Sequence, residues 1–224
     1  MSQFCLVHGS TQGPSGWDLL VPKLNALGHD TILVDLPTDQ PEASATVYAN
    51  RIADSIASDG AIVVAHSASG LFLPLIPAER RVARIVFLAA VIPQIGKSLI
   101  DQVRSDADMM NPDWRGKNPI DDDRVAMEFL FHDCPPEVAR WAMTTRRLTM
   151  ARQAMLEIFP VDEWPSTPCS SIVCADDRTI HPVWSRRVAR ERLGVEPIEL
   201  DGGHCPHVSR PAALAQALDG ISVS

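Results

Sequence analysis

The sequence predicts an α/β fold in which a mostly parallel sheet carries helices on both faces. Short apolar runs alternate with segments of helical spacing, and these runs are apolar throughout, as expected for strands buried on both sides. The alternation stops near residue 93 and resumes after residue 168, and the interval contains no clear strand. We therefore expect a single domain over residues 1–224 with an inserted helical lid at about 93–168.

The composition is that of an ordinary globular protein and argues against several other classes. Of the 224 residues, 46% are hydrophobic and 21% are charged, which is too apolar for a disordered chain and enough for a sizeable core. The net charge of −8, without a run of lysine or arginine, makes nucleic acid and anionic membranes unexpected partners. No apolar run approaches membrane-spanning length, and the N-terminus is typical of a strand rather than a signal peptide. The five scattered cysteines are expected to be reduced, which favours a cytoplasmic location.

Four strands are predicted in the first half of the chain, with helices between them. The strands are expected at 4–7, 31–34, 61–65 and 84–90, and the helices at 17–27, at 45–57 and from about residue 68. Gly28 is a C-terminal stop for the first helix, and Asp59-Gly60 is a turn into the third strand. Pro74 is expected to kink or shorten the third helix, which should be over by Pro77.

The second half begins with the excursion and then returns to the alternating pattern. Helical patches are expected at 125–131 and 137–150 within the excursion. The alternation resumes with strands at 170–174 and 197–200 and with helices at 183–193 and 212–218. Strands separated by helices in this way pair in parallel, so their carboxyl ends share one edge of the sheet.

The strongest chemical motif is Ala65-His66-Ser67-Ala68-Ser69-Gly70, directly between a predicted buried strand and a helix. Such a tight turn holds its serine in a strained conformation and exposes the hydroxyl at the carboxyl end of the sheet. The turn needs small residues two positions to either side, and Ala65 and Ser69 meet this condition for Ser67. Ser69 fails it, because Leu71 is too large. A helix start rich in serine and alanine is the alternative interpretation.

Two further positions supply candidates for a base and an acid. His204 lies in a glycine-containing loop after the last predicted strand, and His207 competes with it near the start of the final helix. Asp176 and Asp177 directly follow the strand at 170–174, although solvated turn aspartates are common. The order serine, aspartate, histidine is that of one type of hydrolase triad, and all three positions follow strands. We therefore expect the triad to be complete on the sheet without the lid.

The loop His8–Gly13 is the candidate for stabilising an oxyanion. Acyl transfer needs two backbone N–H groups directed at the developing negative charge. Ala68, the residue after the serine, would supply one, and Ser10 in this loop would supply the other, although a plain glycine turn is the alternative. His204 and His207 are spaced like metal ligands, but no second cluster of cysteine and histidine accompanies them, so neither a metal nor an organic cofactor is expected.

Taken together, these motifs resemble the α/β-hydrolase superfamily over the whole chain. The narrower resemblance is to the branch that holds plant-type methyl esterases, hydroxynitrile lyases and their bacterial relatives. The matching segments are Leu6-Val7-His8-Gly9 with Trp17, the turn at 65–70, and Gly202-Gly203-His204-x-Pro206-x-x-Ser209-x-Pro211.

Within that branch, the acid lies five residues before a proline that precedes the next helix. Pro182 therefore selects Asp177 over Asp176. The chain also departs from the family, because Ala65 and Ser69 replace the usual glycines of the turn. The loop at 13–16 looks slightly longer than its counterparts, which blurs the assignment of the oxyanion donors.

The resemblance implies a serine hydrolase of the carboxylesterase type that cleaves a small, moderately apolar ester through an acyl-enzyme. In the lyases of the branch, a lysine follows the catalytic histidine and a threonine follows the histidine of the oxyanion loop. Cys205 and Gly9 occupy these positions here, which favours an esterase over a hydroxynitrile lyase. A non-hydrolytic enzyme on the same triad, such as a lyase or cyclase, and a ligand-binding protein with little turnover are the alternatives.

Methionine and aromatic side chains of the excursion could line an apolar pocket for the acyl or alcohol group. They are Met109, Met110, Trp114, Met127, Phe129, Phe131, Trp141, Met143 and Met150. For any one of them, packing of the lid onto the sheet is the preferred interpretation.

Overall fold

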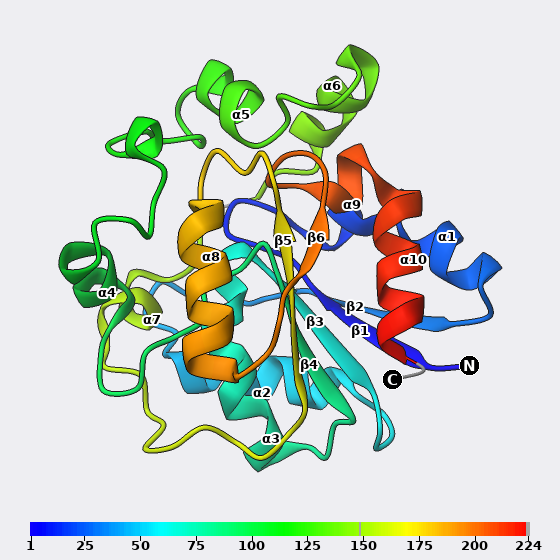
Figure 1. Cartoon of the computed structure of the whole chain (residues 1–224), viewed down its shortest axis with the longest axis vertical. Helices are drawn as coiled ribbons and strands as arrows, with labels where there is room; N and C mark the ends of the chain where they lie inside the picture. The colour runs from blue at the N-terminus through cyan, green and yellow to red at the C-terminus, as the bar shows by residue number, and fades with distance from the viewer. Residues whose placement is uncertain (148, 223–224) are drawn as a thin grey trace.

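A computed structural model describes residues 1–147 and 149–222, and within them six strands form one sheet (Figure 1). The strands are β1 (Gln3–Val7), β2 (Asp30–Val34), β3 (Ile62–His66), β4 (Arg84–Leu88), β5 (Cys169–Cys174) and β6 (Ile198–Leu200). Their order is β2-β1-β3-β4-β5-β6, and each neighbouring pair is parallel. The predicted parallel sheet is therefore confirmed, and its strands end along a single edge.

Helices cover both faces of the sheet, as predicted. On one face pack α2 (Ala45–Ser55) and α8 (Pro182–Val188), and on the other pack α1 (Val21–Ala26) and α10 (Pro211–Ser222) (Figure 1). Successive side chains of a strand point to opposite faces, so β1 contributes Cys5 and Val7 to the first core and Phe4 and Leu6 to the second. This double burial is why the strands read as continuous apolar runs.

Helix boundaries differ from the prediction where proline or a tight turn intervenes. The segment expected at 17–27 is a 3₁₀ helix at Pro14–Trp17 followed by α1. The helix after Ser67 is a 3₁₀ helix, η2 (Ser67–Leu75), and α3 (Ile76–Glu79) continues it past Pro77, so the predicted end there is wrong. Pro77 sits at the second position of α3, where a missing N–H costs no intrahelical bond.

The excursion is helical, and its described residues contribute no strand to the sheet. It contains α4 (Leu99–Ser105), η3 (Pro112–Trp114), α5 (Asp123–Phe129), α6 (Pro136–Thr144) and α7 (Arg152–Leu156). The patches predicted at 125–131 and 137–150 correspond to α5 and α6, and residue 148 lies outside the described residues. The short helices α4 and α7 were not predicted, and α7, with five residues, is too brief to produce a periodic pattern. Both α5 and α6 lie above the carboxyl ends of the strands (Figure 1).

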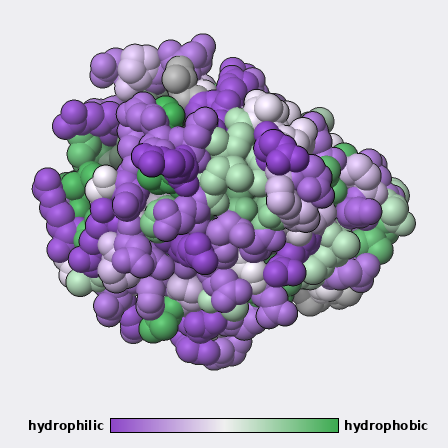
Figure 2. Space-filling model, turned by 90° about the horizontal axis from the view of Figure 1, so that it is seen from above, coloured by the Kyte–Doolittle hydropathy of each residue, from purple (hydrophilic) through white to green (hydrophobic). Residues whose placement is uncertain are grey.

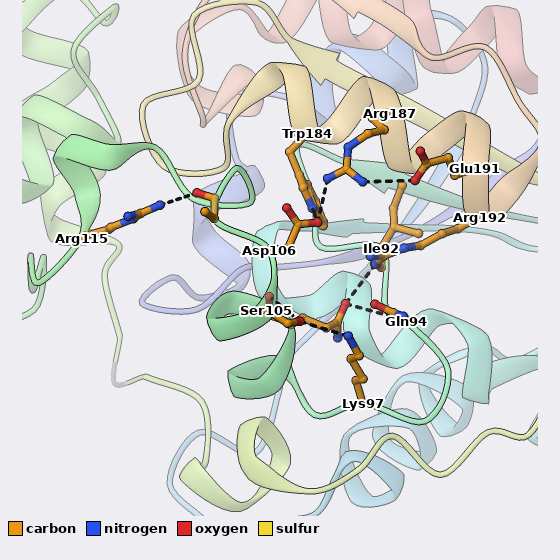
Figure 3. Close-up of polar contacts among 12 residues, drawn as sticks. Ile92, Gln94, Lys97, Ser105, Asp106, Arg115, Trp184, Arg187, Glu191 and Arg192 are labelled. Atoms are coloured by element: carbon orange, nitrogen blue, oxygen red, sulfur yellow. Dashed lines mark hydrogen bonds and ion pairs between the residues drawn. The ribbon is translucent and has the colours of Figure 1, made fainter.

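A polar clamp fastens the first part of the excursion to α8 and the helical turn that follows it (Figure 3). Asp106 accepts hydrogen bonds from Trp184 Nε1 (2.9 Å) and Arg187 Nη2 (2.7 Å). Arg192 donates to Gln102 Oε1 (3.0 Å), and its guanidinium lies 5.5 Å from the centre of the Trp184 ring. The beginning of the excursion is thus attached to the helical layer that covers the sheet.

Among the described residues, no helix combines the length and apolar character needed to cross a bilayer.

Candidate active site

Ser67 lies at the point where β3 passes into η2, and its backbone is strained. Its φ is +57°, in the left-handed region that non-glycine residues rarely adopt. The turn is crowded, because a Cβ at Gly70 would lie 2.2 Å from the Val91 carbonyl oxygen. Ser69 is fully buried and its hydroxyl donates to the His8 carbonyl, which ties this turn to the loop after β1. The expected strained turn is present, and Ser67 is partly exposed whereas Ser69 is buried.

A hydrogen-bond chain runs from Ser67 through His204 to Asp177. The Ser67 hydroxyl lies 2.9 Å from His204 Nε2, and His204 Nδ1 lies 2.8 Å from Asp177 Oδ2. The three residues follow β3, β6 and β5, so the shared carboxyl edge brings them together from three parts of the sequence. Because His204 and Asp177 are buried, their interaction is poorly screened by water. This arrangement lets the imidazole accept the serine proton while the carboxylate faces its other nitrogen.

Asp177 is held in one orientation by the turn that follows it. Its Oδ1 atom accepts from the Thr179 amide (2.7 Å), the Thr179 hydroxyl (2.9 Å) and the Ile180 amide (3.1 Å). These bonds leave Oδ2 free to face His204. Asp176 is exposed, and His207 is buried beside Trp17. Both competing candidates for the acid and the base therefore lie outside the hydrogen-bond chain from Ser67 to Asp177.

The loop after β1 faces the serine. Ser10 and Ala68, the two predicted oxyanion donors, border the same cavity as Ser67 and His204. Gly9 is packed tightly, because a Cβ there would lie 2.7 Å from His66 Nδ1 and 3.0 Å from the Ser67 Cβ.

The cavity beside Ser67 has a volume of about 240 Å³ and a mainly apolar wall. Its apolar lining includes Val91, Leu99, Met110, Trp114, Ile120, Leu130 and Ile180, and its polar lining includes Thr11, Gln12, Asn118 and Thr149. Of the nine lid side chains considered above, Met110 and Trp114 line it, and the others pack elsewhere. Seen from above, the surface of this end of the molecule is largely hydrophilic, with a pale apolar region near its middle (Figure 2).

Lid residues hydrogen-bond to the loops that carry Asp177 and His204. The Asp133 carboxylate accepts from the Gly203 amide (2.8 Å), next to His204, and His132 Nε2 donates to the Asp176 carbonyl (3.2 Å), next to Asp177. Ser67, Asp177 and His204 all follow strands of the sheet, as predicted, and the lid adds hydrogen bonds to the loops of Asp177 and His204. Sequence reasoning missed these contacts because Asp133 and His132 lie about 70 and 44 positions from their partners, and no local pattern marks them.

The groups beneath His204 are neutral because they are buried. Burial and the neighbouring His204 lower the pKa of His207 to about 3. Burial, then His207, His204 and His8, lower the pKa of His66 well below its usual range. Burial also raises the pKa of the Cys205 thiol well above its usual range. The floor of the site therefore carries no charge near neutral pH.

Residues 6–217 match the alpha/beta hydrolase family. The chain belongs to this family. Among known proteins it is similar to salicylic acid-binding protein 2 of Nicotiana tabacum (27% identity over 96% of this chain and 95% of that protein). It is also similar to methylesterase 2 of Arabidopsis thaliana (25% identity over 98% of this chain and 95% of that protein).

Solved structures confirm the α/β-hydrolase fold. Polyneuridine aldehyde esterase superposes with a TM-score of 0.81, at 22% identity over 99% of each chain. A pyrethroid hydrolase from Sphingobium faniae JZ-2 superposes with a TM-score of 0.75, at 19% identity over 100% of this chain and 98% of that one. The resemblance inferred from the motifs is therefore confirmed at the level of the superfamily and of its methylesterase-like relatives.

Proposed function

We propose that this α/β hydrolase is a carboxylesterase that cleaves small, moderately apolar esters through an acyl-enzyme. The single observation that carries the proposal is the continuous hydrogen-bond chain from Asp177 through His204 to Ser67 at the wall of a cavity. The similarity to a methylesterase supports cleavage of an ester bond in particular.

The mechanism assigns one role to each group. Ser67 attacks the ester carbonyl while His204 Nε2 takes its proton, and Asp177 holds the imidazole tautomer that makes this possible. The N–H groups of Ser10 and Ala68 stabilise the oxyanion of the tetrahedral intermediate. His204 then returns the proton to the leaving alcohol, and a water molecule activated by the same histidine releases the acid from Ser67.

The cavity wall supports an uncharged substrate. Among the described residues that line it there is no lysine, arginine, aspartate or glutamate, so an ionised group on the ester would be buried without a partner. The apolar side chains favour an aliphatic or aromatic acyl or alcohol group, and about 240 Å³ limits its size. The substrate class is therefore a small neutral ester.

Two positions support hydrolysis over cyanohydrin cleavage. A lyase of this type needs a cation beside the catalytic histidine to hold the departing cyanide, and Cys205 is instead a fully buried, neutral thiol. Gly9 stands where the lyases have threonine, and any side chain there would press on His66 and Ser67. Both positions leave the reaction centre suited to water.

The domain organisation and the cellular compartment are two further parts of the proposal. We assign the chain to one domain in which residues 93–168 form the lid, supported by the contacts of this segment with the acid and base loops. The five cysteines are free thiols, which supports a reducing compartment such as the cytoplasm.

Active-site titration with a fluorophosphonate tests the proposed nucleophile. The wild-type protein should be labelled at one site per chain, and the matched variant Ser67→Ala should not be labelled. Absence of labelling in the wild type would favour a ligand-binding protein with little turnover. Labelling that persists in Ser67→Ala would assign the nucleophile to another residue.

Paired activity assays test the reaction class. A short aryl ester should be hydrolysed and mandelonitrile should release little cyanide. Efficient cyanide release with negligible ester hydrolysis would replace the esterase by a lyase that uses the same triad.

A further inference from the structure

Three buried polar side chains form a second hydrogen-bond chain beneath His204. His66 Nε2 lies 2.7 Å from the His204 carbonyl oxygen, His66 Nδ1 lies 3.1 Å from Gln12 Oε1, and Gln12 Nε2 lies 3.3 Å from Cys205 Sγ. All three side chains are at most 3% exposed. They come from the loop after β1, from the position before Ser67 and from the position after His204. The chain therefore joins the three loops that the proposed mechanism uses.

The donor and acceptor roles in this hydrogen-bond chain follow from the His204 carbonyl at one end, whose role is known. A backbone carbonyl only accepts, so His66 Nε2 must carry a hydrogen and donate to His204. His66 Nδ1 then either carries a second hydrogen, which makes the ring a cation, or presents a lone pair. The titratable groups that act on the ring are His207, His204 and His8, and none of them is an acid. A buried cation without an acidic partner is strongly disfavoured, so His66 is neutral and Nδ1 accepts.

An accepting Nδ1 requires a donor, and the Gln12 amide is the group in contact with it. A half-turn about the last side-chain bond of Gln12 exchanges its oxygen and NH₂ positions without moving other atoms. The NH₂ group then donates to His66 Nδ1, and the oxygen accepts from the Cys205 thiol. Each contact in this orientation pairs a donor with an acceptor: Cys205 S–H with Gln12 oxygen, Gln12 N–H with His66 Nδ1, and His66 Nε2–H with the His204 carbonyl.

We infer that Gln12 is a positioning residue, which keeps His66 in its neutral Nε2–H form so that His66 can anchor the His204 backbone. This inference rests on the proposed role of His204 as the base. In that role His204 becomes a cation during the reaction, and the centres of its ring and the His66 ring are 4.7 Å apart. A charged His66 would repel this cation at close range and so raise the barrier to proton transfer.

The variant Gln12→Glu replaces a hydrogen-bond donor to His66 by an acceptor of almost the same shape. Its carboxylate can only accept, so it should draw a second proton onto His66. Gln12→Leu removes the donor without adding charge, and Gln153→Glu places the same charge change on an exposed residue of α7. We expect kcat to fall by about 100-fold in Gln12→Glu, by less in Gln12→Leu, and to stay unchanged in Gln153→Glu.

Nitrogen-15 NMR of histidine-labelled protein supplies a readout that does not depend on activity. His66, identified by the signal lost in His66→Gln, should appear as the neutral Nε2–H tautomer in wild-type protein at neutral pH. It should appear doubly protonated in Gln12→Glu. A wild-type His66 that is doubly protonated or carries its proton on Nδ1 would overturn the inference, as would a neutral His66 in Gln12→Glu. If Gln12→Glu does not fold, the wild-type spectrum still decides the tautomer. Failure of Ser67 labelling would overturn the esterase proposal without changing the spectrum.

Discussion

Ser67, the proposed nucleophile, and its proposed partners Asp177 and His204 are held in place by different parts of the molecule. The Ser67 turn is fixed by the sheet and its neighbours: the Val91 amide donates to the Ser67 carbonyl (3.0 Å), and Gly70 packs against the Val91 backbone. The loops of Asp177 and His204 are also bound by the lid, through His132 and Asp133.

Backbone bonds strengthen this difference. The lid residues Met109 and Asn111 exchange hydrogen bonds with His181 (3.0 Å) and Thr179 (2.8 Å), just after the acid. A strained turn is stable only where its surroundings over-determine it, and the sheet supplies that rigidity to Ser67. Asp177 and His204, by contrast, need only the correct orientation relative to each other, and contacts of their loops with the lid can adjust it. Damage to the lid should therefore impair the proposed proton transfer while leaving the Ser67 turn intact.

The largest expected effect concerns the acid. Asp177→Asn should lower kcat by roughly 10⁴-fold with the fold retained, because the imidazole loses the partner that selects its tautomer. Asp176→Asn is the matched control, and its exposed side chain predicts little change. Ester hydrolysis by both variants, with circular dichroism as a check of folding, gives the comparison. A reversal of the two results would place the acid at Asp176.

Gly70→Ala tests how strongly the sheet dictates the nucleophile turn. The new Cβ would lie 2.2 Å from the Val91 carbonyl oxygen, and backbone must move to relieve the overlap. We expect a loss of about 3 kcal/mol in the free energy of unfolding, measured in urea. Gly220→Ala, where a Cβ meets nothing within 4 Å, is the control. Equal stability of the two variants would show that the Ser67 turn can adapt to an added Cβ at position 70.

Asp133→Ala tests the attachment of the base loop to the lid. It leaves the Gly203 amide without its acceptor, so we expect a loss of about 1–3 kcal/mol in unfolding free energy and a fall of roughly 10-fold in kcat/KM. Fluorophosphonate labelling in the long-time limit should still be stoichiometric, because the Ser67 turn is unchanged. The exposed lid variant Asp162→Ala serves as control. Reduced stability with unchanged kcat/KM would mean that the lid contact is structural alone.

The last expected effect is on stability alone, a pH dependence set by the buried His207. The folded-state pKa of His207 is about 3, against 6.5 ordinarily, so between these values the unfolded chain binds a proton that the native chain does not. The contribution of His207 to the free energy of unfolding is fully present above about pH 6.5. On acidification it falls by up to about 1.4 kcal/mol per pH unit. His207→Phe keeps an aromatic ring beside Trp17 and should flatten the slope by that amount in urea titrations at pH 4–6. An unchanged slope would exclude His207 as its source.

Local physics in the sequence determined much of the fold and part of the site. Strands buried on both faces need continuous apolar runs, and the turn at Ser67 needs small neighbours, so both leave marks within a few residues. The proximity of Ser67, Asp177 and His204, which follow β3, β5 and β6, could likewise be predicted, because parallel strands bring their carboxyl ends to one edge.

Choices between neighbouring side chains were decided by the tertiary structure. Asp176 and Asp177 are adjacent in sequence and equal in chemistry, and family spacing, not local physics, favoured Asp177. In the structure Asp177 is buried and bonded by the Thr179 turn, while Asp176 faces solvent. The orientation of a side chain beyond the end of a strand depends on the path of the following loop, which distant contacts determine.

The supporting contacts of the site were set by the tertiary structure alone. His66 meets the His204 carbonyl from 138 positions away, and Asp133 meets Gly203 from 70 positions away. Hydrogen bonds between such distant groups leave no period and no spacing in the sequence. They form only after the sheet and the lid have brought their loops together, because each bond requires a donor and an acceptor within about 3 Å of one another.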